Sequence, residues 1–301
     1  MIWDCLIVGG GPAGLTAAIY AARFRLSTLV VDAGASRARA IPRSHNHAGF
    51  PGGIEGETLV ERMGEQARQF GAQIRRQTVT SLQRQESGFL ARTAQERLQA
   101  RAVIVATGVV NHRPLMDLAT HDAALASGAL RYCPVCDGYE AMDQEIGVVG
   151  SGERAVREAI FLRSYSSRVA VVRAQGGELP PEAPAELAAA DVRLIGGEAR
   201  DFRLEDGRLS FVADQGRLAF DAVYPAMGSS VRSDLAREAG AAVSEDGCIC
   251  VDAHQHTSVE ALYAAGDVVL GLDQISHAMG QAGVAATTLR NELAQRRPIR
   301  R

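Results

Sequence analysis

The sequence predicts an α/β protein made of two Rossmann-like dinucleotide-binding domains, with the second domain inserted into the first. A strand, a glycine-rich turn and a helix stand at the N-terminus, and the same unit occurs again near residue 146. Each unit is followed by a further strand-to-turn segment, at 101–108 and at 261–269. The chain has 301 residues, which favours two domains at about 150 residues each.

The composition is that of an ordinary globular chain. Its 32 Lys+Arg against 35 Asp+Glu give a formal charge of −3, which argues against a nucleic-acid partner. No stretch reaches the roughly 18 apolar residues of a membrane span, and the start lacks a basic leader region. Five cysteines are too few for a disulfide-built secreted scaffold. We therefore expect a cytoplasmic protein without a membrane partner.

The first unit combines a strand at 4–8, the turn GGGPAG, a helix over 13–23 and a strand that ends at Asp32. Glycines in such a turn let the backbone approach a pyrophosphate, and the helix N-terminus attracts the phosphates. A carboxylate after the second strand accepts hydrogen bonds from a ribose diol. The residues predicted to form this dinucleotide site are Gly9, Gly11, Pro12, Ala13, Gly14 and Asp32.

The second unit repeats this order, with a strand at 146–149, a helix over 153–164 and a strand at 168–172. A G-x-G-x-x-A turn connects the first strand to the helix. The residues predicted to hold a second dinucleotide are Gly150, Gly152, Ala155 and Arg173.

The two units differ at the residue after their second strand. Arg173 lies as far after Gly150 as Asp32 lies after Gly9. An acid there favours a ribose 2′-hydroxyl, whereas an arginine accommodates a 2′-phosphate. The units are therefore expected to bind two different dinucleotides. The alternative is that Arg173 is a solvated charge at a strand end.

Two further segments end in residues that can meet a ligand. Thr107 and Gly108 follow the strand in 101–108, and Gly266 and Asp267 follow a strand near residue 264. Ligands of open α/β sheets bind at the carboxyl edge, where strands of this kind end.

The motif Cys133-Pro-Val-Cys136 predicts redox chemistry. C-x-x-C holds two sulfurs close enough for a disulfide that cycles readily, and Asp137 beside it can move protons during exchange. A zinc site completed by Cys248 and Cys250 is one alternative, and a pair of inert thiols is another. We expect Cys248 and Cys250 to share one face of a strand and to pack in the core.

Over nearly its whole length, the chain resembles the low-molecular-weight thioredoxin reductases in the order of its motifs. These motifs are GGGPAG, NHAGFPGGIEG, ATG, CPVCDGYE, G-x-G-x-x-A and AAGDV. The resemblance implies FAD in the first unit, NADPH in the inserted unit that carries the C-x-x-C motif, and a homodimer. It further implies flavin contacts from a set of matched positions. These are Asn46, Thr107, Gly108, Gly266, Asp267, Gln274 and Ile275.

The same resemblance assigns roles at the disulfide. Cys136 faces the flavin, Cys133 attacks the substrate disulfide, and Asp137 donates the proton. The predicted domains are a discontinuous FAD-binding domain, 1–112 and 228–301, and an insert, 113–227, with boundaries that rest on Arg113-Pro114 after the ATG strand and on the turn Gly228-Ser229-Ser230. The roles of three histidines near the expected flavin site stay open: His45, His47 and His277.

Two departures from the family pattern bear on the electron donor. The family's His-Arg-Arg run after the second unit is Arg173-Ala174-Gln175 here. Two lost charge-assisted bonds weaken 2′-phosphate binding by roughly two to four powers of ten. The motif CPVCDGYE also differs from the common reductase form CATCDGFF.

The sequence therefore predicts an enzyme that passes electrons from a reduced nicotinamide, used weakly, through FAD and the disulfide. The substrate is a disulfide or dithiol, in a thioredoxin-like protein or a small molecule. One alternative is a dithiol oxidase that uses O2 and keeps a vestigial nucleotide site. Others are a ferredoxin-fed reductase and a flavin-binding sensor without turnover. Cys5 is expected in the core, and the tail from Gln295 to Arg301 is expected to be frayed.

Overall fold

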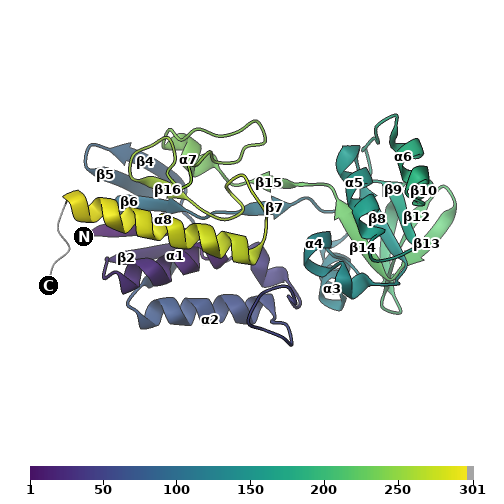
Figure 1. Ribbon diagram of the computed structural model, residues 1–301, viewed down its shortest axis with the longest axis horizontal. Helices are drawn as coiled ribbons and strands as arrows, with labels where there is room; N and C mark the ends of the chain where they lie inside the picture. The colour runs from purple at the N-terminus through teal and green to yellow at the C-terminus, as the bar shows by residue number, and fades with distance from the viewer. Residues whose placement is uncertain (297–301) are drawn as a thin grey trace.

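The computed structural model describes residues 1–296, which form two lobes joined by a narrow connection (Figure 1). The last helix, α8, runs over Ile275–Arg296, so Gln295 and Arg296 are helical rather than frayed. The remainder of the expected tail lies outside the described residues.

The first lobe is built on a seven-stranded sheet of order β3-β2-β1-β6-β5-β4, with β16 paired to β6. Strands β1, β2, β3, β6 and β16 pair parallel with one another, whereas β5 pairs antiparallel with both β6 and β4. The bounds are β1 Ile2–Val8, β2 Thr28–Asp32, β3 Gln73–Arg76, β4 Ser81–Gln85, β5 Gly88–Arg92, β6 Arg97–Val105 and β16 Leu262–Ala264.

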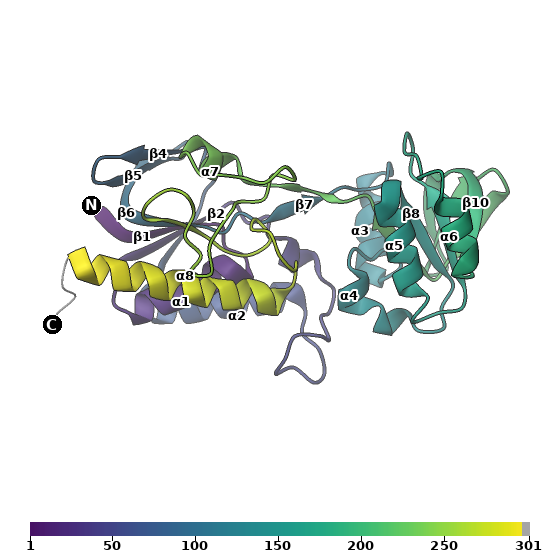
Figure 2. The same cartoon turned by 45° about the horizontal axis from the view of Figure 1, so that its top comes forward.

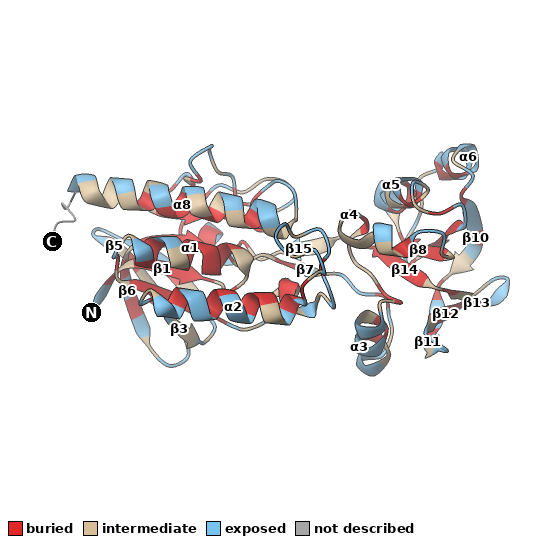
Figure 3. Ribbon diagram, turned by 60° about the horizontal axis from the view of Figure 1, so that its bottom comes forward, coloured by how far each residue is buried: buried red, intermediate tan, exposed pale blue. Residues whose placement is uncertain are grey.

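Helices α1, α2 and α8 lie together along this lobe (Figure 2). Each of these helices carries buried segments, red in Figure 3. Small side chains allow the close packing of α1 and α8, since Ala17, Ala18, Ala282 and Ala285 have no exposed surface. The helices of this lobe are α1 Pro12–Arg23, η1 Arg37–Ala40, α2 Gly56–Gln69, α7 Asp234–Glu238 and α8.

The second lobe has a parallel four-stranded sheet, β10-β9-β8-β14, and an antiparallel three-stranded sheet, β11-β12-β13. Its strands are β8 Ile146–Gly150, β9 Val169–Arg173, β10 Arg193–Glu198, β11 Arg200–Glu205, β12 Arg208–Ala213, β13 Gly216–Phe220 and β14 Ala222–Ala226. Its helices are α3 Leu118–Ser127, α4 Pro134–Asp137, η2 Tyr139–Ala141, α5 Gly152–Leu162 and α6 Ala183–Ala189.

Two short strands join the lobes, β7 Val109–Asn111 and β15 Ser229–Val231, and they pair antiparallel. The α/β fold with two strand–turn–helix units is therefore confirmed. The boundaries at 112/113 and 227/228 stay a prediction; they fall at the two joining strands.

One expectation about the cysteines is wrong. Cys248 and Cys250 do not lie in a strand, and neither packs in the core, since Cys248 is partly exposed and Cys250 is exposed. Ile249 between them is fully buried and forms isolated bridges to Val243 and Val269. Because neighbouring side chains of extended backbone point in opposite directions, a buried Ile249 turns both cysteines outward. Cys5 is fully buried in β1, as expected.

No helix in the stretch 1–296 is both long enough and apolar enough to cross a membrane.

Candidate redox site between the two lobes

A cavity of about 1020 Å³ begins at the carboxyl edge of the first sheet and reaches the second lobe. Parallel strands β1, β2, β6 and β16 all end at this edge, so residues distant in the sequence meet there. Fifteen of the predicted site residues line it: Gly9, Gly11, Pro12, Ala13, Asp32, Asn46, Thr107, Gly108, Cys133, Cys136, Asp137, Gly266, Asp267, Gln274 and Ile275.

The first glycine turn is packed on one side and open on the other. At Gly9, where φ is +110°, an added Cβ would lie 2.2 Å from the carbonyl oxygen of Ala106. At Gly14 it would lie 1.8 Å from the Gly9 carbonyl, so Gly14 serves helix packing and does not line the cavity. At Gly11 it would meet only Ser36, at 3.0 Å. Gly11 therefore leaves the backbone open to a pyrophosphate, as an FAD site requires.

Asp32 is fixed at the end of β2 by its own neighbourhood. Its Oδ1 accepts hydrogen bonds from the backbone N–H groups of Gly10 at 3.1 Å and Gly34 at 3.0 Å. Arg76 Nη1 lies 3.9 Å from its Oδ2. The side chain is nearly buried at the cavity wall, which suits a carboxylate that binds a ribose diol.

The two cysteines form a disulfide at the other end of the cavity, with 5.2 Å between their Cα atoms. Gln274 Nε2 donates to Cys133 Sγ at 3.4 Å and to Cys136 Sγ at 3.2 Å. Gln274 Oε1 in turn accepts from Asn46 Nδ2 at 2.9 Å, and Asn46 Oδ1 accepts from Ser44 Oγ at 3.1 Å. One predicted flavin contact, Gln274, thus lies directly against the disulfide from the first lobe, and a second, Asn46, holds its amide.

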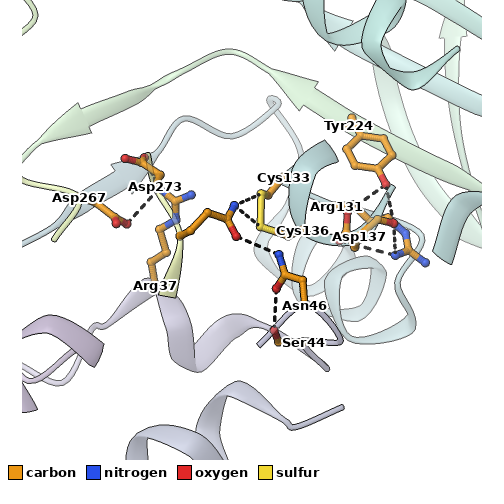
Figure 4. The surroundings of a disulfide bond; sticks show 11 residues. Arg37, Ser44, Asn46, Arg131, Cys133, Cys136, Asp137, Tyr224, Asp267 and Asp273 are labelled. Atoms are coloured by element: carbon orange, nitrogen blue, oxygen red, sulfur yellow. Dashed lines mark hydrogen bonds and ion pairs between the residues drawn. A yellow bond between two sulfur atoms is a disulfide. The ribbon is translucent and has the colours of Figure 1, made fainter. Parts of the chain in front are cut away.

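The Asp137 carboxyl is held on the second-lobe side of the disulfide (Figure 4). Tyr224 from β14 donates to its Oδ1 at 3.0 Å, and Arg131 Nη1 lies 3.6 Å from its Oδ2. Burial raises the pKa of Asp137 to about 6, against the opposing effects of Arg131 and Tyr224. A carboxyl with a pKa in this range can exchange a proton near neutral pH.

Arg37 is a site residue that the sequence reasoning missed. Its Nη1 lies 3.5 Å from Asp267 and 3.0 Å from Asp273 (Figure 4). Burial and the neighbouring Asp273 raise the pKa of Asp267, and Arg37 lowers it. The acidic residues at 267 and 273 were the available sequence signal, because two neighbouring carboxylates favour a cation between them.

Arg131 and Tyr224 were missed as well. Arg131 could have been identified as a site residue from the sequence, because it lies only two residues before Cys133. Tyr224 comes from a strand 87 residues after Asp137, and nothing in the local sequence connects the two.

The second glycine turn has different surroundings. The backbone N–H of Gly152 donates to the carbonyl of Glu178 at 2.7 Å. Arg173 Nη1 contacts Glu178 Oε1 at 3.0 Å and the Gly177 carbonyl at 3.2 Å. A Cβ at Gly177 would come within 2.7 Å of Ser151 Cβ, so segment 176–178 packs directly on the turn.

The three histidines are not equivalent. His45 lines the cavity. His47 stacks on Phe50, with ring centroids 5.5 Å apart, and its Nδ1 lies 3.3 Å from Ser276 Oγ. Burial lowers the pKa of His47. His277 is exposed in the first turn of α8.

Across residues 1–296, no group of three or more His, Cys, Asp or Glu side chains is arranged to hold a metal ion.

Comparison with known proteins agrees with this arrangement. The sequence profile described as pyridine nucleotide-disulphide oxidoreductase matches residues 3–282. A thioredoxin reductase from Mycolicibacterium smegmatis is 32% identical over 285 residues, with 89% of each chain covered. The crystal structure of HlmI superposes with a TM-score of 0.88 at 29% identity, covering 98% of this chain and 93% of that one. Thioredoxin reductase from Streptococcus pyogenes MGAS5005 gives a TM-score of 0.87 at 26% identity, covering 98% and 99%.

Proposed function

The chain belongs to the pyridine nucleotide-disulphide oxidoreductase family, and we propose that it moves electrons between FAD and a substrate dithiol or disulfide through Cys133 and Cys136. One observation carries the proposal: a single cavity runs from the open glycine turn to the disulfide. The open backbone at Gly11 and the fixed carboxylate of Asp32 fit FAD. When bound, FAD supplies two-electron chemistry, accepting or giving an electron pair.

The chain's own residues carry out the thiol exchange. A substrate thiolate attacks Cys133 Sγ, the Cys133–Cys136 bond breaks, and Cys136 leaves as a thiolate that takes a proton from Asp137. The second substrate thiol then displaces Cys133, and its proton passes to the Cys133 sulfur. The substrate becomes a disulfide, and the enzyme pair becomes two thiols. The reverse sequence reduces a substrate disulfide.

Gln274 supports this exchange from the first lobe. Its amide donates to both sulfurs, and a hydrogen bond to a charged acceptor is stronger than one to a neutral acceptor. The bond therefore favours the thiolate that forms when the disulfide opens. Asn46 fixes the orientation of the amide, since its Nδ2 donates to Gln274 Oε1.

For the electron donor, weak use of NADPH or NADH fits the second glycine turn. A pyrophosphate needs free backbone N–H groups there, and Gly152 already donates to Glu178. The same observation favours a second candidate, dithiol oxidation with O2 as the final acceptor. Relatives named thioredoxin reductase support the first candidate and a thioredoxin-like protein substrate.

Anaerobic titration of the FAD-loaded protein tests this proposal. We expect micromolar dithiol to bleach the flavin absorbance and to expose two alkylatable cysteines, with NADPH and NADH active only at millimolar concentration. Rapid, saturable bleaching by micromolar NADPH would show a competent nucleotide site. Bleaching by neither donor would contradict the dithiol pathway and indicate a protein donor such as ferredoxin.

We also propose a cytoplasmic homodimer, by the family resemblance. Light scattering at micromolar concentration checks the assembly, and a monomeric mass would contradict it.

A further inference from the structure

Two side chains from different parts of the second lobe contact the carboxyl of Asp137. Tyr224 lies in the middle of β14 and is fully buried, yet its hydroxyl is 3.0 Å from Asp137 Oδ1 and 3.2 Å from the Asp137 carbonyl oxygen. Arg131, in the loop before α4, lies 3.6 Å from Oδ2 and 3.4 Å from the same carbonyl. Each carboxylate oxygen therefore has its own partner.

The charges around this carboxyl act in opposite directions. Burial and Glu140 raise the pKa of Asp137, whereas Arg131 and the hydrogen bond from Tyr224 lower it. Arg131, Glu140 and Tyr224 are the titratable or charged side chains that act on the carboxyl. Burial and Asp137 itself raise the pKa of Tyr224, so the hydroxyl remains a donor. Without the two donors, Asp137 would keep its proton to higher pH.

A packing role alone does not explain these contacts. Tyr224 belongs to an apolar cluster that includes Ile146, Val148 and Val171, where a phenylalanine would bury the same ring. A buried hydroxyl is costly without a partner, and its acceptors here are both on Asp137, the carboxyl at 3.0 Å and the carbonyl oxygen at 3.2 Å. Arg131 is mostly buried beside the same cavity.

We propose that Arg131 and Tyr224 are positioning residues that keep Asp137 able to both release and regain a proton as the disulfide opens and closes. This inference rests on the proposed function, in which Asp137 protonates the leaving Cys136 thiolate. When the disulfide opens, the proton passes from the carboxyl to the sulfur, and Arg131 and Tyr224 stabilise the carboxylate left behind. When the disulfide closes again, the carboxylate takes the proton back.

The test is the pH dependence of disulfide opening by dithiothreitol in the FAD-loaded protein, followed by alkylation and mass spectrometry. Dividing the wild-type rate by that of Asp137→Asn at each pH removes the ionisation of dithiothreitol itself. We expect this ratio to be high at low pH and to fall with a midpoint near pH 6, where Asp137 loses its proton.

Arg131→Met keeps an unbranched stem and removes the charged guanidinium. We expect the midpoint, measured against the double variant Arg131→Met/Asp137→Asn, to rise by about one pH unit or more. Tyr224→Phe should raise the midpoint by less, because it removes a neutral donor. Arg131→Lys keeps a positive charge, so its midpoint should return most of the way to the wild-type value. Should Arg131→Met fail to fold or to hold FAD, Tyr224→Phe decides the matter alone.

The outcomes separate this inference from the function on which it rests. The positioning role would be overturned if Arg131→Met and Tyr224→Phe lowered the rate equally at every pH and left the midpoint unchanged. The proposed function would then remain intact. A wild-type to Asp137→Asn ratio that is flat across pH would overturn the role of Asp137 as well.

Discussion

The two glycine turns share a sequence order but have different surroundings. In the first lobe, Gly11 faces the cavity, and an added Cβ would meet only Ser36. In the second lobe, the N–H of Gly152 is already bonded to the carbonyl of Glu178. The motif thus specifies a strand–turn–helix geometry, and a different part of the chain decides whether the turn is open to a ligand.

The residues after the second strands show the same contrast. Asp32 is held by backbone N–H groups of Gly10 and Gly34 and lines the cavity. Arg173 is neutralised by Glu178, which belongs to the segment that covers the turn. A charge that could select a 2′-phosphate is therefore already paired within the protein.

Blocking the first turn should have the broadest effect, because turnover requires the bound FAD. Gly11→Val places a branched side chain where the backbone faces the cavity. Overpacking costs about 1–3 kcal/mol, which lowers FAD affinity by roughly 5- to 150-fold. The ratio of flavin to protein absorbance in purified samples measures the loss, and circular dichroism checks that the fold is retained.

Gly152→Val is the matched control in the second turn. Its φ of +60° makes the variant strained, but Gly152 lies away from the cavity, so normal FAD content is expected. Full FAD content in Gly11→Val would break the comparison, since the first turn would then not be the open one.

A structural feature could be predicted from the sequence when residues close together along the chain determine it. Both strand–turn–helix units were predictable because a local glycine and hydrophobic pattern specifies them. Two contacts could not be predicted in this way: the hydrogen bond from Tyr224 to Asp137 and the hydrogen bond from the Gly152 N–H to the Glu178 carbonyl. Each joins segments that only the folded chain brings together.

The error at Cys248 and Cys250 has a similar cause. Side chains along an extended segment point alternately to opposite sides, so either the two cysteines or Ile249 can face the core. The sequence alone does not determine which side faces inward. Tertiary packing selects Ile249, the larger apolar side chain, which joins the core of the first lobe.

Removing the Cys133 sulfur should have a narrower effect, on thiol exchange alone, and should separate the two lobes functionally. We expect Cys133→Ser to keep its FAD, because the open turn belongs to the first lobe, and to lose dithiol or disulfide turnover by about 10³-fold or more. Stopped-flow absorbance with a dithiol measures the loss. Cys5→Ser, a change at a buried cysteine outside the site, is the control for general thiol effects. Full turnover in Cys133→Ser would favour the inert-thiol alternative.

The smallest effect should come from Arg173. Because its guanidinium already contacts Glu178 and the Gly177 carbonyl, little of its charge is available to a nucleotide phosphate. A partly exposed ion pair contributes up to about 1 kcal/mol, so Arg173→Ala should change the rate of flavin reduction by NADPH less than roughly fivefold. Glu178→Gln frees the arginine and should raise that rate by a similar small factor, leaving the rate with NADH unchanged. Both rates follow from stopped-flow bleaching under nitrogen. A loss of two or more powers of ten in Arg173→Ala, specific to NADPH, would show that Arg173 binds the 2′-phosphate. The second turn would then be open in solution, and the contrast between the two turns would disappear.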